Sequence, residues 1–136
     1  MIDDLLRNDC FHLEIDGVSA GGFLHCSGLG GEVSVFEFTE GGTMSPRKFP
    51  DERAVSNVVL ERGVVRSQEL YSWFVKGDSR DGAIVLLNAD GREEIRWELK
   101  RAWPCRWSGP SLDARESAVA VEWIELVHEG CEWNPR

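Results

Sequence analysis

Apolar and polar residues alternate along several short stretches of this chain, a pattern typical of β-strands with one buried face. The clearest case is residues 94–100, in which Ile95, Trp97 and Leu99 alternate with charged residues of both signs. A second case is Phe11–Ile15, where three apolar residues alternate with polar ones. Both stretches are predicted to be half-buried strands, and the mixed charges of 94–100 suit a solvated or intersubunit surface.

Turn signals separate these strands from several others. Asp16-Gly17 predicts a turn, Asp90-Gly91 predicts a hairpin, and Gly109-Pro110 breaks the chain again. Strands are also expected through Phe23 and Leu24 as far as Gly28, and at residues 32–39, 54–62, 82–88 and 118–128.

The expected strand at 32–39 has apolar residues on both faces. Val33 and Val35 share one face, and Phe36 and Phe38 share the other. Either a bulge shifts the register, or both faces are covered. The chain then turns polar over residues 40–53, which contain two glycines and two prolines, and this segment is expected to be a long loop or an extended arm.

One helix is predicted, over residues 67–76, with Ser67 as its N-cap and Gly77 just after its end. Three apolar residues at helical spacing line one face and are expected to pack on the sheet: Leu70, Trp73 and Phe74.

The fold expected from these elements is mainly β (α+β), a small antiparallel β-barrel or sandwich of about six to eight strands with one flanking α-helix. The 136 residues suit a single domain spanning 1–136. Several strands have apolar residues on both faces, and one helix is too small to cover them all. The surplus apolar faces are best explained by contacts with other subunits.

The charge of the chain narrows the possible partners. A net charge of −9 and a pI near 4.8 argue against a nucleic-acid-binding surface and against an anionic membrane. No apolar run is long enough to span a bilayer, and the N-terminus lacks the basic region of a signal peptide. The protein is therefore expected to be made and folded in the cytosol.

Metal and cofactor sites are not predicted. None of the four cysteines stands in a Cys-x-x-Cys pair, and a cytosolic compartment would keep them reduced. His12, His25 and His128 have no ligand spacing, so ordinary surface or satisfied core histidines are favoured.

Catalytic motifs are also missing from the sequence, so an enzyme is not expected. There is no Gly-x-Ser-x-Gly nucleophile turn, and Gly28–Gly31 lacks the lysine of a phosphate loop. Six tryptophans leave open a carbohydrate-binding β module that stacks sugars on exposed rings. Trp73 and Trp97 lie on apolar faces and favour packing, whereas Trp107 and Trp133 could be surface residues.

Several short motifs follow one another along nearly the whole chain; each is weak alone, but their order and spacing together are fairly specific. The motifs are Phe11–Gly17, Gly22-Phe23 with Ser27–Leu29, Glu40–Gly42 with Pro46–Lys48, Leu60–Gly63, the helix with Trp73, Ala102–Pro104, Gly109-Pro110 and Val121–Glu129. In this order they resemble the tube proteins of contractile phage tails and of phage-tail-like bacterial injection particles.

The resemblance implies a β-barrel flanked by one helix, similar in fold to the ring protein of type VI secretion. It implies hexameric rings that stack into a hollow tube within a contractile sheath, with no catalytic residues and no cofactor. The implied partners are other copies of the chain, the sheath, baseplate and tape-measure proteins, and DNA or protein cargo held in the lumen without specific binding. The subunit would be made in the bacterial cytoplasm and assembled into a tail or a particle that can be released. A specialised ring at the baseplate end, which shares the fold, is the alternative.

Ring stacking in this family involves extended loops and the N-terminal part of the chain. For this sequence, the resemblance implies that residues 40–53 take part in ring stacking. Arg47, Lys48 and Arg53 are therefore hypothesised to contact acidic groups on the adjacent ring.

Overall fold

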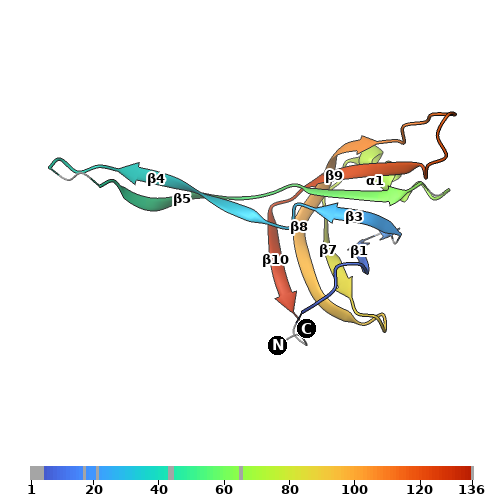
Figure 1. The fold of residues 1–136 in the computed structure, drawn as a ribbon, viewed down its shortest axis with the longest axis horizontal. Helices are drawn as coiled ribbons and strands as arrows, with labels where there is room; N and C mark the ends of the chain where they lie inside the picture. The colour runs from blue at the N-terminus through green and yellow to red at the C-terminus, as the bar shows by residue number, and fades with distance from the viewer. Residues whose placement is uncertain (1–4, 17, 21, 43–44, 65, 136) are drawn as a thin grey trace.

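The computed structural model describes residues 5–135 apart from 17, 21, 43–44 and 65, and it consists mainly of antiparallel strands with one helix (Figure 1). The helix is α1 (Glu69–Lys76). The strands are β1 (Phe11–Ile15), β2 (Val18–Ala20), β3 (Phe23–Ser27), β4 (Gly31–Phe38), β5 (Arg47–Val55), β6 (Val58–Gly63), β7 (Arg80–Leu87), β8 (Glu93–Ser108), β9 (Val121–Val127) and β10 (Gly130–Pro135).

The 16-residue strand β8 organises the main sheet because it belongs to both halves of it. Its first part pairs with β7 and β10, and its last part pairs with β9. The change of partners falls at Arg101, which has a left-handed backbone (φ 50°) and donates its N–H to the Asp81 carboxylate at 2.9 Å. Figure 1 shows the resulting curvature of β8, which brings the two halves of the sheet around a shared interior.

The strand order is β2-β1-β7-β8-β9-β6-β3, with β10 added beside β8. Among the described residues, β2 and β3 do not pair with each other, so hydrogen bonds do not close the sheet into a barrel. The predicted antiparallel β fold with one helix is confirmed, in the form of an open, strongly curved sheet.

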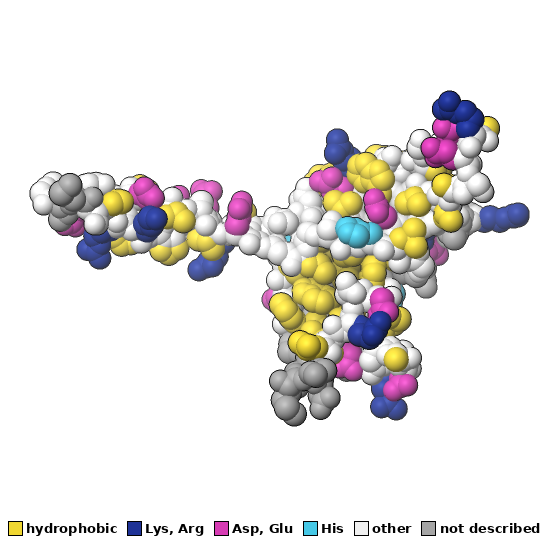
Figure 2. All heavy atoms as spheres, viewed as in Figure 1, with side chains coloured by type: hydrophobic (Ala, Val, Ile, Leu, Met, Phe, Trp, Pro, Cys, Tyr) yellow, Lys and Arg dark blue, Asp and Glu magenta, His cyan; other side chains and the backbone are white. Residues whose placement is uncertain are grey.

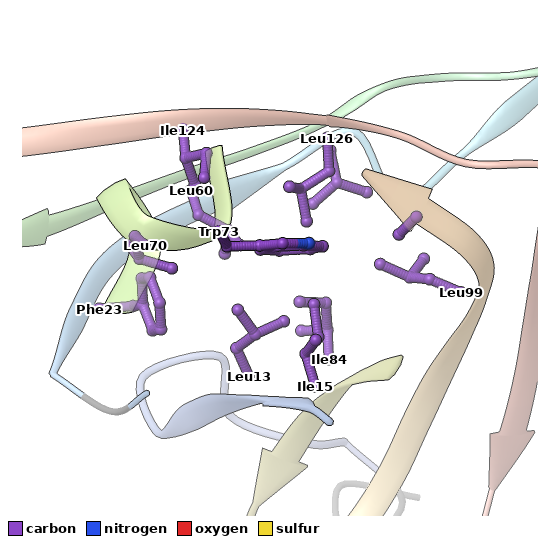
Figure 3. Close-up of a cluster of buried hydrophobic side chains, with 12 residues drawn as sticks. Leu13, Ile15, Phe23, Leu60, Leu70, Trp73, Ile84, Leu99, Ile124 and Leu126 are labelled. Atoms are coloured by element: carbon purple, nitrogen blue, oxygen red, sulfur yellow. The ribbon is translucent and has the colours of Figure 1, made fainter. Parts of the chain in front are cut away.

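Trp73 lies at the centre of the hydrophobic core. Figure 3 shows its indole between Leu60 and Leu126 on one side and Leu13 and Ile84 on the other, so one side chain contacts both halves of the sheet. The ring is 1% exposed, and its N–H donates to the Asp78 carbonyl at 2.8 Å. This bond satisfies the polar atom that burial of a tryptophan would otherwise leave without a partner.

The other two residues of the predicted helix face occupy different positions. Leu70 is fully buried in the same core, whereas Phe74 is half-buried and lies beside Trp107, with 6.5 Å between ring centroids. Tyr71 packs edge-on against Trp107, with 5.0 Å between ring centroids. Helix α1 therefore contacts the core through Leu70 and Trp73 and contacts the end of β8 through its aromatic residues.

The ends of the helix correct one prediction and agree with another. The N-cap is Gln68 and makes no side-chain capping hydrogen bond, so Ser67 as N-cap was wrong. Ser67 lies one residue too early for its hydroxyl to reach the first free N–H groups of the helix. Gly77 ends the helix as expected, in a left-handed conformation with its N–H donated to the Trp73 carbonyl at 2.8 Å.

Several predicted strand limits also differ from the structure. The strand expected at 54–62 is divided at Ser56-Asn57, because the chain changes sheets there between β5 and β6. Strand β9 begins at Val121 rather than at residue 118, and neither β2 nor β10 was predicted. The turn expected at Asp16-Gly17 includes Gly17, which lies outside the described residues.

Truncation of Trp73 tests this account of the core. Trp73→Ala should lower the free energy of unfolding by about 3–5 kcal/mol, because it leaves a large cavity between the two halves of the sheet. Trp133→Ala is the matched control, since that ring is 63% exposed and its removal should cost roughly 1 kcal/mol or less. Urea unfolding of dilute, unassembled protein gives both values. A Trp73 loss no larger than the Trp133 loss would contradict the central position of Trp73.

Candidate assembly surface

Strands β4 and β5 form a two-stranded sheet of their own that projects from the rest of the protein (Figure 1). We call residues 31–55 the arm. For residues 40–53 the sequence left open a long loop or an extended arm; residues 47–53 belong to strand β5 of the arm, and Glu40–Gly42 belong to the turn between its strands. Every arm residue whose burial is described is exposed except Val33, which is half-exposed.

The pairing of the arm strands places different apolar residues on its two faces. Phe36 stands opposite Phe49, and Phe38 lies two residues further along the same face. These residues are 53%, 42% and 47% exposed, respectively, and we call their side of the arm the aromatic face. Val35 stands opposite Pro50 on the other side, which we call the aliphatic face.

A bulge lies between the Val33–Arg53 pair and the Val35–Pro50 pair, and it does not remove the apolar character of either face. Two residues of β5 stand opposite Ser34 of β4, where the register shifts. The Ser34 hydroxyl accepts the Glu52 N–H at 3.0 Å and donates to the Glu52 carbonyl at 3.3 Å. Strand β4 itself keeps its alternation. Neither explanation offered by the sequence holds within this chain: the bulge lies in β5 and leaves the alternation of β4 unchanged, and the apolar groups on both faces are exposed rather than covered.

The basic residues of the arm do not form one cluster. Arg47 is on the aromatic face, with its guanidinium 5.5 Å from the centroid of Phe49. Lys48 is on the aliphatic face, 3.9 Å from the Glu37 carboxylate. Arg53 stands opposite Val33, six residues along β5 and thus about 20 Å nearer the body.

Acidic residues outnumber basic ones along the arm, and Figure 2 shows both signs beside hydrophobic side chains. The five acidic residues are Glu32, Glu37, Glu40, Asp51 and Glu52. Within the part of the chain that the structure describes, Arg47 makes no ion pair with a carboxylate, whereas Lys48 does. Arg53 likewise makes no ion pair among the described residues, so Arg47 toward the far end of the arm and Arg53 near its base are both placed to pair with an acidic group outside the arm.

The base of the arm is held firmly to the body. Gly28 has φ 93° and approaches the Asn57 carbonyl so closely that a Cβ atom would overlap it. The Ser56 N–H donates to the Gly30 carbonyl at 3.0 Å. The Ser56 carbonyl in turn lies 2.8 Å from Nε2 of His128. These contacts fix the direction in which the arm leaves the sheet.

His128 is a satisfied core histidine, which was one of the two roles favoured from sequence. It is buried, and its Nδ1 lies 3.0 Å from the Gly130 carbonyl oxygen. His25 is exposed, and His12 lies 3.5 Å from the Glu14 carboxylate. In the described ranges, no three His, Cys, Asp or Glu side chains are grouped so that they could hold a metal ion. No described helix is long and apolar enough to cross a membrane.

Comparison with known families identifies the group to which this protein belongs. The family described as T4-like virus tail tube protein gp19 matches residues 7–132. The chain belongs to this tail tube family. The match covers most of the sequence, including the arm and both halves of the main sheet, so the resemblance inferred from the motifs is confirmed.

Solved structures with the same fold come from contractile injection systems and type VI secretion. A chain of the sheath–tube complex of PVC, an extracellular contractile injection system, is 23% identical with a TM-score of 0.89; the match covers 99% of this chain and 95% of that one. A chain of the anti-feeding prophage cap is 24% identical with a TM-score of 0.86, and the coverage is 97% and 92%. Hcp1 from Flavobacterium johnsoniae is 13% identical with a TM-score of 0.65, and the coverage is 93% and 96%. A search of curated proteins finds no significant match.

Proposed function

We propose that this tail tube family member is the repeating subunit of the inner tube of a contractile tail or injection particle. Copies form hexameric rings, and the rings stack into a hollow tube inside a sheath. The protein acts by self-assembly and performs no catalysis. Baseplate and tape-measure proteins contact the tube at its ends and interior, and DNA or protein cargo passes through the lumen.

The observation that supports this proposal most directly is the exposure of both faces of the arm. A two-stranded hairpin is marginally stable in water unless another layer covers it, and the arm presents Phe36, Phe49 and Val35 to solvent. In the proposed tube, a different part of another copy covers the arm. Such a head-to-tail contact between copies repeats from subunit to subunit and generates rings or stacked assemblies.

The acidic composition is compatible with a conduit. A net charge of −9 per subunit, repeated around a ring, repels nucleic-acid phosphates and weakens nonspecific adhesion of anionic cargo. The same charge opposes assembly, so subunit contacts must combine apolar burial with local pairing of opposite charges.

Electron microscopy of the purified protein tests the proposal. Negative-stain images should contain rings and hollow tubes that lengthen with protein concentration. Single rings that never stack would favour the specialised ring at the baseplate end. A monomer that binds polysaccharide would contradict a tube role and favour the tryptophan-rich carbohydrate-binding module.

The role proposed for the basic residues of the arm can be separated residue by residue. Arg47→Glu should prevent rings from stacking while the body stays folded, because it places a negative charge on the aromatic face where an acidic partner is expected. Lys48→Glu should have a smaller effect, since Lys48 pairs with Glu37 inside the arm. Arg53→Glu, near the base, completes the series.

Circular dichroism and thermal melting provide the folding control for these variants, and electron microscopy measures tube length at two salt concentrations. Stacking through Arg47 should weaken as salt screens the contact. Tubes of normal length from Arg47→Glu would refute an inter-ring role for this residue.

A further inference from the structure

A pocket of about 290 Å³ lies between the segment before β1 and the turn that joins β7 to β8. Apolar side chains form much of its lining: Leu5, Leu6, Leu86 and Leu87. Asp9 and Glu94 add two carboxylates to the same lining. Arg7 adds a guanidinium, so the pocket combines an apolar interior with two acidic groups and one basic group.

Hydrogen bonds hold one wall of this pocket, at Cys10, β7 and the turn, whereas Leu5 and Leu6 on the other wall are 74% and 45% exposed. The Leu87 N–H donates to the Cys10 carbonyl at 2.8 Å and ties the N-terminal segment to β7. In the turn, the Asn88 side-chain oxygen accepts the N–H groups of Asp90 and Arg92, each at 2.9 Å. The Asn88 amide group donates to the Glu94 carboxylate at 2.9 Å. A ligand would therefore meet one wall that is already formed, which reduces the entropy lost on binding.

The size and charge of the pocket match the aromatic face of the arm. A cavity of about 150 Å³ is enough to hold a benzene ring, so this pocket has room for the ring of one phenylalanine and part of a second. Phe36 and Phe38 are exposed side by side on the arm, and Arg47 is on the same face. The Asp9 carboxylate lies 3.5 Å from the Arg7 guanidinium, so it already has a basic partner. The carboxylate that remains to pair with Arg47 is that of Glu94, which accepts a hydrogen bond from the Asn88 amide.

We propose that this pocket receives the aromatic face of the arm of a second copy of the chain, with Phe36 or Phe38 among its leucines and Arg47 beside Glu94. The arm of the same chain points away from the body and from the N-terminal segment, so the contact joins two copies (Figure 1). This inference rests on the proposed tube function and names the surface to which the arm docks.

Cys10 allows a direct test, because this exposed thiol lines the pocket. Phe38→Cys and Phe36→Cys, each in a Cys105→Ser background, place a thiol on the aromatic face. Assembled tubes are oxidised mildly at pH 8 and run on a non-reducing gel, and the linked peptides are identified by mass spectrometry. Disulfides between copies, joining position 36 or 38 to Cys10, are expected.

The remaining thiols should compete poorly in this reaction. Burial, and then the neighbouring Cys131, raises the pKa of Cys26 to about 11, so its thiol stays protonated at pH 8. Burial also raises the pKa of Cys131. Val35→Cys on the aliphatic face is the matched control and should link to Cys10 far less, and Cys10→Ser should abolish the links.

The outcomes separate this inference from the proposed function. Tubes without links from position 36 or 38 to Cys10, or with equal links from position 35, would overturn the docking site while leaving the tube role intact. If the cysteine variants fail to form tubes, p-benzoylphenylalanine at position 38 keeps an aromatic group there. Photocrosslinks from it to residues 5–10 or 86–94 of another copy would support the site, and crosslinks elsewhere would contradict it. Wild-type protein that forms no rings or tubes would instead count against the proposed function itself.

Discussion

A two-stranded hairpin that projects from a protein can satisfy its backbone between its own strands, but it has no second layer to bury its side chains. The arm of this tail tube protein meets the first condition through the pairing of β4 with β5. It does not meet the second, since Phe36, Phe38 and Phe49 are exposed on one face and Val35 on the other. Burial of an apolar side chain is worth about 1.5–3 kcal/mol, so cover from another molecule is the main stabilisation available to the arm.

The body is built so that it does not depend on the arm. Trp73 contacts both halves of the curved sheet, and β8 connects those halves through continuous backbone. The contacts of Ser56 with Gly30 and His128 anchor the base of the arm to this body. A rigid body that directs an arm at a fixed angle is well suited to repeated, identical contacts between copies.

The parts of the fold that could be predicted from sequence are those whose pattern reflects burial within the chain. Alternation in residues 94–100 revealed β8 because one face of that strand meets the chain's own core. The spacing of Leu70 and Trp73 revealed the helix for the same reason. Strand β5 was missed because its residues are exposed on both faces, and Pro50 breaks the usual strand pattern; proline is tolerated there since each arm strand has a free edge.

Other features were hidden for different reasons. Cys131 and Trp133 alternate with polar residues, and this pattern was a usable signal for strand β10. The pocket brings Leu5 and Leu6 together with residues about eighty positions away in the sequence, so no local pattern could predict it. The basic cluster seen in the sequence separates in the structure, because Arg47 and Lys48 are neighbours in one strand and thus point to opposite faces. Only the pairing register could assign Arg47 to the aromatic face.

Hydrogen exchange, compared between dissociated subunits and assembled tubes, tests most directly whether the arm is completed by other copies. In the dissociated subunit, the amides of β4 and β5 should exchange rapidly, while those of β7 and the first part of β8 stay protected. In tubes, the arm amides should become protected by a large factor, with little change in β7. Equal protection of the arm in both states would contradict the account, since the arm would then be stable without a partner.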